Sequence, residues 1–376
     1  MADEALNKSF TLAVSVYKWP FTPPKMLALQ QKGALILKRP GLSPYRRFSK
    51  IRGLNKTIDK VIDKYVNPFR DLFRLNPDVV CVNQSTTYDS VQFSSSADLL
   101  NMLYTTSIPY VVVCQAHSDL FFPSKTTREA ALKFFSRAYR VVFVSHENKQ
   151  MTERQLAQAL PNALVLQNPV NLSNLAALPW PSSQQVCMAS VGRLEAMAKG
   201  QDILFEALSS PVWQSRDWQL RLYGAGSDQD YLEALTRYYG ISNRVKFLGH
   251  VKDVRAIWSE NHLLVLPSRF EGTPLAMVEA MLCGRPAVVT DVGGNAEWIE
   301  SHIGFVAEAP TAKSFGAALE RAWLAQADWQ KMGIKAHENA IEKFDRSPGK
   351  SLLEVVIDAA HSKVLGQHKV CKERKV

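Results

Sequence analysis

The chain has 376 residues, of which 46% are hydrophobic and 21% charged, a composition typical of folded globular proteins. Its length exceeds what one compact core usually holds, so two domains are expected. No apolar run approaches the roughly 20 residues of a membrane span, the acidic N-terminus lacks the apolar stretch of a signal peptide, and no C-x-x-C pair occurs. We therefore expect a cytoplasmic protein in a reducing compartment.

The net charge of +10 is carried by the first part of the chain. Residues 1–170 contain 22 Lys and Arg against 12 Asp and Glu, whereas residues 171–376 contain 23 of each. This excess either serves solubility alone or attracts an anionic partner, such as membrane head groups or a phosphorylated acceptor, which would place the protein at the inner face of a membrane. No nucleic-acid partner is expected. The cluster that concentrates the charge is Arg46, Arg47, Lys50, Arg52, Lys56, Lys60 and Lys64.

Short apolar runs alternate with helical patterns along the first 170 residues. Continuous apolar runs are typical of parallel strands buried on both faces, and strands that alternate with helices indicate βαβ units. The pattern predicts strands over residues 12–17, 34–37, 79–82, 110–114, 141–144 and 164–166. It predicts helices over residues 55–75, 89–106, 126–138 and 147–160.

Prolines between residues 168 and 181 indicate a linker, after which the alternation restarts. Strands are predicted over residues 186–191, 220–223, 245–247, 263–266 and 287–290. Helices are predicted over residues 201–208, 229–239, 254–259, 274–282, 312–325 and 351–365.

These elements predict two facing, doubly wound, Rossmann-like α/β domains with a cleft between them. The N-terminal domain would span residues 1–170 and the C-terminal domain residues 171–350, with the helix in residues 351–376 packing back on the first domain. In such sheets ligands bind at the carboxyl ends of the strands.

The segment from Glu271 to Pro286 carries the strongest functional signal. Thr273 is a good N-cap and Pro274 a good first helical residue, and the unpaired N–H groups of a helix start bind phosphate readily. Glu271 precedes this start and Glu279 lies in the second turn, so two carboxylates that can accept from hydroxyl groups bracket it. A nucleotide sugar fits this pattern. The alternative is that both glutamates are ordinary solvated charges.

Further polar residues follow predicted strands. Arg193 and Lys199 lie in a glycine-bounded loop after the strand at 186–191, where they can neutralise a diphosphate. His117 follows the strand at 110–114 and would face the cleft, in a catalytic or a merely structural role. The run Asp228-Gln229-Asp230 opens a helix, which explains its acids, so no metal and no other cofactor is expected.

The second half of the chain resembles the family 4 glycosyltransferases of the GT-B architecture. The resemblance covers about residues 186–325 and rests on five segments in order: VGRLEAMAKGQDILFEAL, LRLYGAGSDQDYLEAL, VKFLGHVKDV, LLVLPSRFEGTPLAMVEAMLCGRPAVVTDVGGNAEWI and GFVAE. Glu271 and Glu279 form the E-x7-E element of that family. The family is retaining and metal-independent, with a front-face mechanism in which the leaving phosphate takes the acceptor's proton.

The resemblance also implies a role for each site residue. Arg193 and Lys199 would bind the donor diphosphate, and Glu279 would bind the ribose. Glu271 would be a catalytic residue that binds the transferred sugar. His117 would be a second catalytic residue near the anomeric centre. The donor would be a UDP- or GDP-sugar and the acceptor a glycan, a lipid-linked sugar or a polysaccharide such as lipopolysaccharide. The remaining donor-binding positions would be Gly192, Gly272, Thr273, Pro274 and Leu275 around the phosphate and sugar, and Val251 and Asp253 at the base.

The first half departs from the family pattern. The loop from Tyr17 to Pro24 contains no glycine, although the family usually has glycines there, and Pro169 and Asn171 depart from the usual hinge sequence. A catalytically degenerate protein that acts as a binding or scaffold subunit is therefore the main alternative. Epimerisation or phosphorolysis on the same fold is a third hypothesis that no motif recommends.

Overall fold

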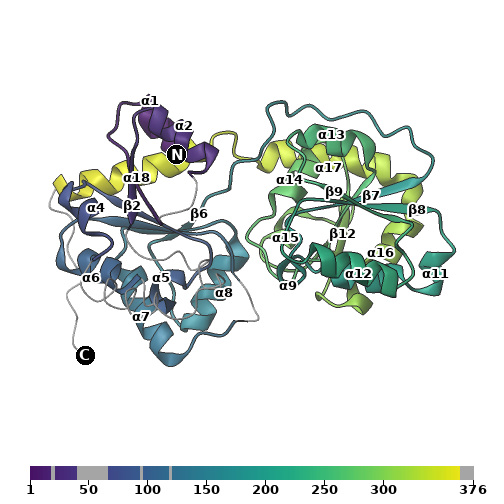
Figure 1. The fold of residues 1–376 in the computed structure, drawn as a ribbon, viewed down its shortest axis with the longest axis horizontal. Helices are drawn as coiled ribbons and strands as arrows, with labels where there is room; N and C mark the ends of the chain where they lie inside the picture. The colour runs from purple at the N-terminus through teal and green to yellow at the C-terminus, as the bar shows by residue number, and fades with distance from the viewer. Residues whose placement is uncertain (18–21, 40–66, 94–95, 118–120, 365–376) are drawn as a thin grey trace, which may run out of the picture.

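The structure, a computed structural model, describes residues 1–17, 22–39, 67–93, 96–117 and 121–364. These residues form two α/β halves that lie side by side, with the N-terminal half on the left of Figure 1 and the C-terminal half on the right. The basic cluster between Arg46 and Lys64 lies outside the described residues. So do residues 18–21 of the glycine-free loop and most of the helix predicted over residues 55–75.

The C-terminal half is built on one parallel sheet, which lies wholly within the described stretch 121–364. Its strand order is β12-β11-β10-β7-β8-β9. Starting from β7, this is the 3-2-1-4-5-6 order of a doubly wound fold, whose topological switch point lies between β7 and β10. The strands are β7 (Val186–Val191), β8 (Trp218–Tyr223), β9 (Val245–Gly249), β10 (Leu263–Leu266), β11 (Ala287–Thr290) and β12 (Gly304–Ala307).

The N-terminal half contains two groups of parallel strands among its described residues. One pair joins β1 (Ala13–Tyr17) to β2 (Leu35–Arg39). The other group, in the order β3-β4-β5-β6, consists of β3 (Val80–Gln84), β4 (Tyr110–Cys114), β5 (Arg140–Phe143) and β6 (Ala163–Val165).

Helices cover the sheets of both halves (Figure 1). In the first half they are α1 (Ala2–Asn7), α2 (Pro24–Gln31), α4 (Arg70–Arg74), α5 (Asp89–Gln92), α6 (Ala97–Thr105), α7 (Lys125–Arg137) and α8 (His146–Leu156). Then follow α9 (Ala196–Lys199), α10 (Gln201–Leu208), α11 (Pro211–Gln214), α12 (Gln229–Tyr238), α13 (Val254–Glu260), α14 (Leu275–Leu282), α15 (Asn295–Trp298), α16 (Ala312–Leu324), the 3₁₀ turn η3 (Gln326–Asp328), α17 (Trp329–Lys343) and α18 (Pro348–Val364).

The strands with the longest apolar runs match their predicted bounds: β4, β7, β10 and β11. All residues of β4, β10 and β11 are buried, because helices cover both faces of these parallel strands. The helix predicted over 89–106 is wrong as a single element, since α5 and α6 divide it. The sequence prediction also missed β12, which is four residues long and begins with glycine, and α17, whose buried face includes the small residues Gly333, Ala336 and Ala340.

The chain crosses between the halves after β6 and again after α17. A single amide joins the two crossings: Gln167 Nε2 donates to the carbonyl of Lys343 at 2.7 Å, and Gln167 Oε1 accepts from the N–H of Asp345 at 2.8 Å. After the second crossing, α18 packs on the N-terminal sheet, where Ala359 joins Val111 and Val113 of β4 in one buried cluster.

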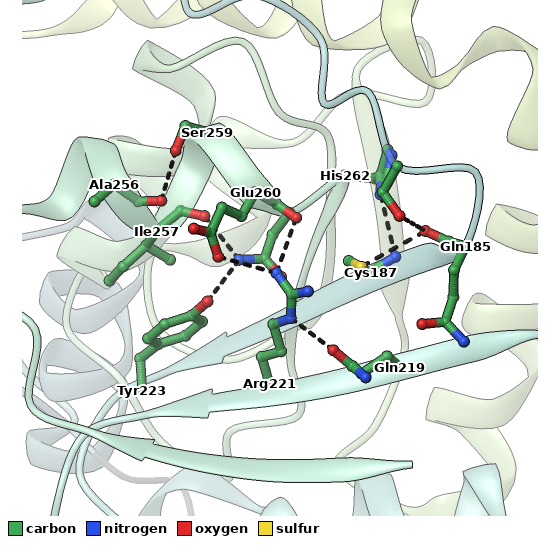
Figure 2. Close-up of polar contacts among 12 residues, drawn as sticks. Gln185, Cys187, Gln219, Arg221, Tyr223, Ala256, Ile257, Ser259, Glu260 and His262 are labelled. Atoms are coloured by element: carbon green, nitrogen blue, oxygen red, sulfur yellow. Dashed lines mark hydrogen bonds and ion pairs between the residues drawn. The ribbon is translucent and has the colours of Figure 1, made fainter.

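The segment that leads from α13 into β10 is held by polar contacts from β7 and β8 (Figure 2). Arg221 of β8 lies between Gln219 and Glu260, its Nε donating to the Gln219 side chain at 2.8 Å and its Nη1 to the Glu260 carboxylate at 3.2 Å. The Nδ1 atom of His262 accepts from the N–H of Cys187 in β7 at 3.1 Å. These contacts hold one end of β10, and the opposite end leads to Glu271.

A buried arginine attaches the linker to the C-terminal half. Arg285 is 1% exposed, and burial lowers its pKa to about 10, so it remains charged at neutral pH. Its Nε donates to the carbonyls of Trp258 and Asn261 at 2.8 and 3.0 Å, and its Nη2 to that of Pro179 at 2.6 Å. The guanidinium also lies 5.3 Å from the ring centroid of Trp180. Carbonyl dipoles rather than a carboxylate therefore solvate this charge.

None of the helices in the described part is both long enough and apolar enough to cross a bilayer.

We predict that Arg285→Met lowers the free energy of unfolding by about 3–5 kcal/mol, because it leaves several buried carbonyl groups unpaired. The control is Arg255→Met, since Arg255 donates to the linker carbonyls of Asn174 and Ala176 at a more exposed site and should cost less than about 1 kcal/mol. Urea unfolding followed by tryptophan fluorescence measures both variants. Equal midpoints for the two variants would show that the buried contacts add nothing.

Candidate active site

The ends of β7 and β10 lie beside each other at the switch point, because these strands pair in parallel. Gly192, directly after β7, lies against Lys199: a Cβ atom at this glycine would be 3.5 Å from Lys199 Cε. Gly200 is left-handed, with φ of +66°, and a Cβ atom there would lie 2.0 Å from the carbonyl oxygen of Pro267. Glycine thus lets the loop that carries Lys199 rest on the end of β10.

Lys199 forms an ion pair with Glu271 at this point. Lys199 Nζ lies 2.6 Å from Glu271 Oε1, and the side chains are 19% and 8% exposed. The hydroxyl of Ser268 donates to the same carboxylate oxygen at 2.8 Å. A mostly buried carboxylate is therefore matched by one cation and one hydroxyl. The sequence prediction named Lys199 and Glu271 but missed Ser268, although it lies three residues before the glutamate.

Arg193 does not join this pair in the described structure. Its Nη1 lies 2.8 Å from the carboxylate of Glu195, and its side chain is 66% exposed. Lys199 is therefore the cation that directly contacts Glu271, while Arg193 lies nearby in sequence on the surface.

The start of α14 differs from the prediction made for it. The helix begins at Leu275, Pro274 has extended backbone angles, and no side chain caps the N–H groups. Thr273 is not the N-cap, because its hydroxyl instead donates to the carbonyl of Val144 in the other half at 2.8 Å. Residues 271–274 are buried, while Leu275 and Ala276 are half-buried. The part of the helix start that a ligand can approach therefore lies later in the chain than predicted.

The two halves touch at this helix start. His117 and Glu271 form an isolated antiparallel bridge, and Asn148 Nδ2 donates to the carbonyl of Glu271 at 3.3 Å. A Cβ atom on Gly272 would lie 2.1 Å from the carbonyl oxygen of Gln115. Only glycine permits this approach, which brings His117 from the first half beside Glu271 from the second.

A second contact joins the halves near the same place. The N–H of Glu147, in the first turn of α8, donates to the carboxylate of Glu297 in α15 at 2.7 Å. A carboxylate at a helix start satisfies an unpaired N–H group and interacts favourably with the helix dipole. The interface therefore carries polar contacts at both the Glu271 loop and α15.

His117 is buried, with 4% of its surface exposed. Its Nδ1 lies 2.7 Å from Thr87 Oγ1, and the ring of Tyr88 meets its ring edge-on at a centroid distance of 5.8 Å. Burial lowers the pKa of His117 to about 4, so the imidazole is neutral at physiological pH. Nε2 is buried and has no hydrogen-bond partner among the described residues. The Gln155 side chain lies close enough to oppose part of this lowering of the pKa, while its Oε1 accepts from Tyr88 and its Nε2 donates to the carbonyl of Phe121.

The other predicted donor-binding residues lie further along the C-terminal half. Glu279 is 4% exposed, its Oε1 accepts from the N–H of Asn171 in the linker at 2.9 Å, and burial raises its pKa. Asp253 caps α13 by accepting from the N–H of Arg255 at 3.0 Å, and Val251 packs on the apolar cluster beneath. Within the described part of the chain, no hydrogen bond or ion pair joins these three side chains to the Lys199–Glu271 pair.

The described residues contain no group of three or more His, Cys, Asp or Glu side chains placed to hold a metal ion. Asp228, from the D-x-D run, accepts from the N–H of Ala196 at 2.9 Å and so fastens the start of α9.

Sequence comparison relates part of the chain to known proteins. Residues 186–324 match the family described as "Glycosyl transferases group 1". A subunit of the human phosphatidylinositol N-acetylglucosaminyltransferase is 28% identical over 48% of this chain and 38% of its own length. Lipopolysaccharide 1,6-galactosyltransferase of Salmonella typhimurium is 31% identical over 34% of this chain and 36% of its own. The chain thus matches well under half the length of these curated relatives.

Structural comparison extends over nearly the whole chain. Anabaena HepE, solved with UDP, has a TM-score of 0.66 and 20% identity, covering 95% of this chain and 94% of HepE. Sucrose-phosphate synthase from Thermosynechococcus elongatus has a TM-score of 0.69 and 16% identity, covering 97% and 91%. The predicted α/β GT-B fold with two Rossmann-like halves is confirmed.

We predict that His117 makes the stability of the protein fall as the pH is lowered. Its pKa is about 4 when folded and near 6.5 when exposed, so between these values the unfolded chain binds more protons. The free energy of unfolding therefore keeps its full value above pH 6.5. It falls by roughly 3 kcal/mol as the pH is lowered towards 4.

Urea unfolding at pH 7.5, 6.0 and 5.0 tests this pH dependence in three chains. His117→Gln should lose less stability over this range than the wild type, whereas His361→Gln, at an exposed site on α18, should follow the wild type. Parallel curves for the wild type and His117→Gln would contradict the assignment.

Proposed function

We propose that the protein is a glycosyltransferase that moves a sugar from a nucleotide-sugar donor to a glycan or lipid-linked acceptor. The observation that carries this proposal is the convergence of Lys199 and Glu271 with His117 at the switch point of the C-terminal sheet. Doubly wound sheets bind ligands at such points. The match of residues 186–324 to a glycosyl transferase family, and the names of the relatives, support the same activity.

We assign the donor diphosphate to the space next to Lys199 and the start of α14. Lys199 supplies a point charge from its ion pair with Glu271. The first N–H groups of α14, at Leu275 and Ala276, add partial positive charge at a half-buried position. Arg193 is the second cation of this site, reached by rotation of an exposed side chain. The backbone of Gly192 and of residues 272–274 forms the rest of the proposed diphosphate site. The nucleotide would be UDP or GDP, and UDP is bound by HepE.

The carboxylates are assigned to hydroxyl groups of the donor. Glu271 would accept from the transferred sugar, because it lies at the junction of the halves beside His117. Glu279 would accept from the ribose, in exchange for or beside the N–H of Asn171 that it now binds. Val251 and Asp253, in the loop between β9 and α13, would lie at the base.

We propose a retaining, metal-independent reaction. The bond between the anomeric carbon and the leaving phosphate oxygen breaks, the acceptor oxygen bonds to the same face of that carbon, and the acceptor's proton passes to the leaving phosphate. Lys199, Arg193 and the start of α14 stabilise the negative charge that develops on the diphosphate, which is electrostatic catalysis. No protein nucleophile is needed.

The acceptor is assigned to the N-terminal half. Its net charge of +10 over residues 1–170 favours an anionic or membrane-bound acceptor, and lipid or polysaccharide acceptors occur in the names of the relatives. A degenerate scaffold is disfavoured, because Lys199, Ser268 and Glu271 form a buried polar group that a pure binding protein does not require.

We predict that Glu271→Gln lowers kcat by about 100-fold or more while the affinity for the nucleotide alone changes by less than about threefold, since Glu271 is assigned to the sugar and the glutamine oxygen can still accept from Lys199. Arg193→Ala should lower both quantities, because it removes a diphosphate contact. Glu338→Gln, at an exposed position of α17, is the control and should match the wild type. Donor hydrolysis and transfer are measured with a panel of UDP- and GDP-sugars, and nucleotide binding by calorimetry.

Absence of turnover by the wild type with every nucleotide sugar would favour the scaffold hypothesis. Unchanged turnover in Glu271→Gln would remove Glu271 from the site, even if the chain is an active enzyme.

A further inference from the structure

The loop after β3 is a rigid frame for His117. Gln84, at the end of β3 and 3% exposed, donates through Nε2 to the carbonyl of Thr87 at 2.9 Å and accepts through Oε1 from the N–H of Ser90 at 2.9 Å. Asp89 accepts from the N–H groups of Ser85 and Thr86, each at 2.9 Å. The strand end and the loop's own acid therefore fix the backbone on both sides of Thr87.

This frame presents one hydroxyl to His117. Thr87 is 1% exposed, and its Oγ1 lies 2.7 Å from His117 Nδ1 and 3.4 Å from the carbonyl oxygen of Ala116. The next residue, Tyr88, packs edge-on against the imidazole and is itself held by Gln155. The ring therefore has one orientation, with Nδ1 towards Thr87 and Nε2 away from it.

The hydrogen-bond partners of Thr87 select one tautomer of the ring. A hydroxyl has a single proton, and the Ala116 carbonyl can only accept. If Thr87 donates to Ala116, it must accept from His117, so Nδ1 carries the hydrogen. In the other tautomer the hydrogen is on Nε2, so the Thr87 hydroxyl would have to donate to Nδ1. The Ala116 carbonyl would then lose Thr87 as its donor. The arrangement that satisfies each atom is the chain from Nδ1–H to Oγ1–H to the carbonyl.

In this tautomer Nε2 carries a bare lone pair. It is buried and has no partner among the described residues, and buried polar atoms are normally hydrogen-bonded. A lone pair accepts from a hydroxyl but cannot donate to a phosphate oxygen. Nε2 is thus suited to a sugar hydroxyl and not to the diphosphate.

We propose that Thr87 is a positioning residue that holds His117 as the Nδ1–H tautomer, so that Nε2 accepts a hydrogen bond from a hydroxyl of the transferred sugar. The assignment rests on the proposed glycosyltransferase function for its ligand, and on geometry alone for its tautomer. It explains why the loop after β3, which has no recognisable motif, is held by several hydrogen bonds from Gln84 and Asp89.

The tautomer is tested without any ligand. With ¹⁵N-labelled histidine in the full chain, the ring nitrogens of His117 are identified by their loss in His117→Gln, and their shifts distinguish Nδ1–H from Nε2–H. The wild type and Thr87→Ser should show Nδ1–H. Thr87→Val, which keeps the shape but removes the hydroxyl, should populate Nε2–H. A wild-type ring in the Nε2–H form, or no change in Thr87→Val, would overturn the proposal.

The effect on the sugar is tested by kinetics with UDP-glucose, UDP-galactose, UDP-N-acetylglucosamine and GDP-mannose. Thr87→Val should lower kcat/KM for the accepted donor by roughly 10-fold or more, as loss of an orienting partner does elsewhere, and leave the affinity for UDP alone unchanged. Thr87→Ser should restore most of the loss. The control is Thr236→Val, which removes a buried hydroxyl that donates to a backbone carbonyl of α12 in the other half.

The outcomes separate this proposal from the proposed function. If the wild type turns over no donor, the function fails, while the nitrogen shifts still decide the tautomer. If the wild type is active and Thr87→Val matches it, or if Thr87→Val weakens UDP binding itself, the assignment of Nε2 to a sugar hydroxyl is wrong.

Discussion

The arrangement of the site depends on a backbone contact between the halves, at Gly272. The absence of a side chain there lets the Glu271 loop pair with His117 and approach Gln115. Each half alone would present only part of the site: the first a neutral imidazole, the second an ion pair between Lys199 and Glu271. A sheet in the 3-2-1-4-5-6 order supplies the ion pair at its switch point, and β4 supplies the imidazole at its carboxyl end. The two sheets therefore meet through their strand ends, where doubly wound folds bind ligands.

Much of this could be predicted from the sequence, because buried parallel strands read as continuous apolar runs. The run at β4 places His117 at a strand end, and the run at β10 places Glu271 after one. The start of α14 could not be predicted in the same way. Thr273 has the sequence signature of an N-cap, but its hydroxyl donates to the carbonyl of Val144 in the other half. Local propensity does not include a partner that lies far away in the chain.

The roles of Thr87 and Ser268 show a second limit of sequence reasoning. Both are common hydroxyl residues in loops, where solvent exposure is the usual outcome. Their burial, and their contacts to His117 and Glu271, follow only from the tertiary packing. Arg193 illustrates the reverse case, since its sequence context resembles a diphosphate contact while its side chain pairs with Glu195 on the surface. Charged side chains on long stems are placed by rotamers that sequence does not specify.

The amide of Gln167 has a mechanical consequence. It binds both places at which the backbone passes from one half to the other, so these passages act as one pivot instead of two independent tethers. A turn about this pivot would part Gly272 from Gln115 and Glu297 from the first turn of α8, while the six-stranded sheet and its ion pair moved as a rigid unit. The C-terminal half, with its ion pair between Lys199 and Glu271, would thus stay fully assembled throughout such a swing, and only the imidazole of His117 would arrive or depart.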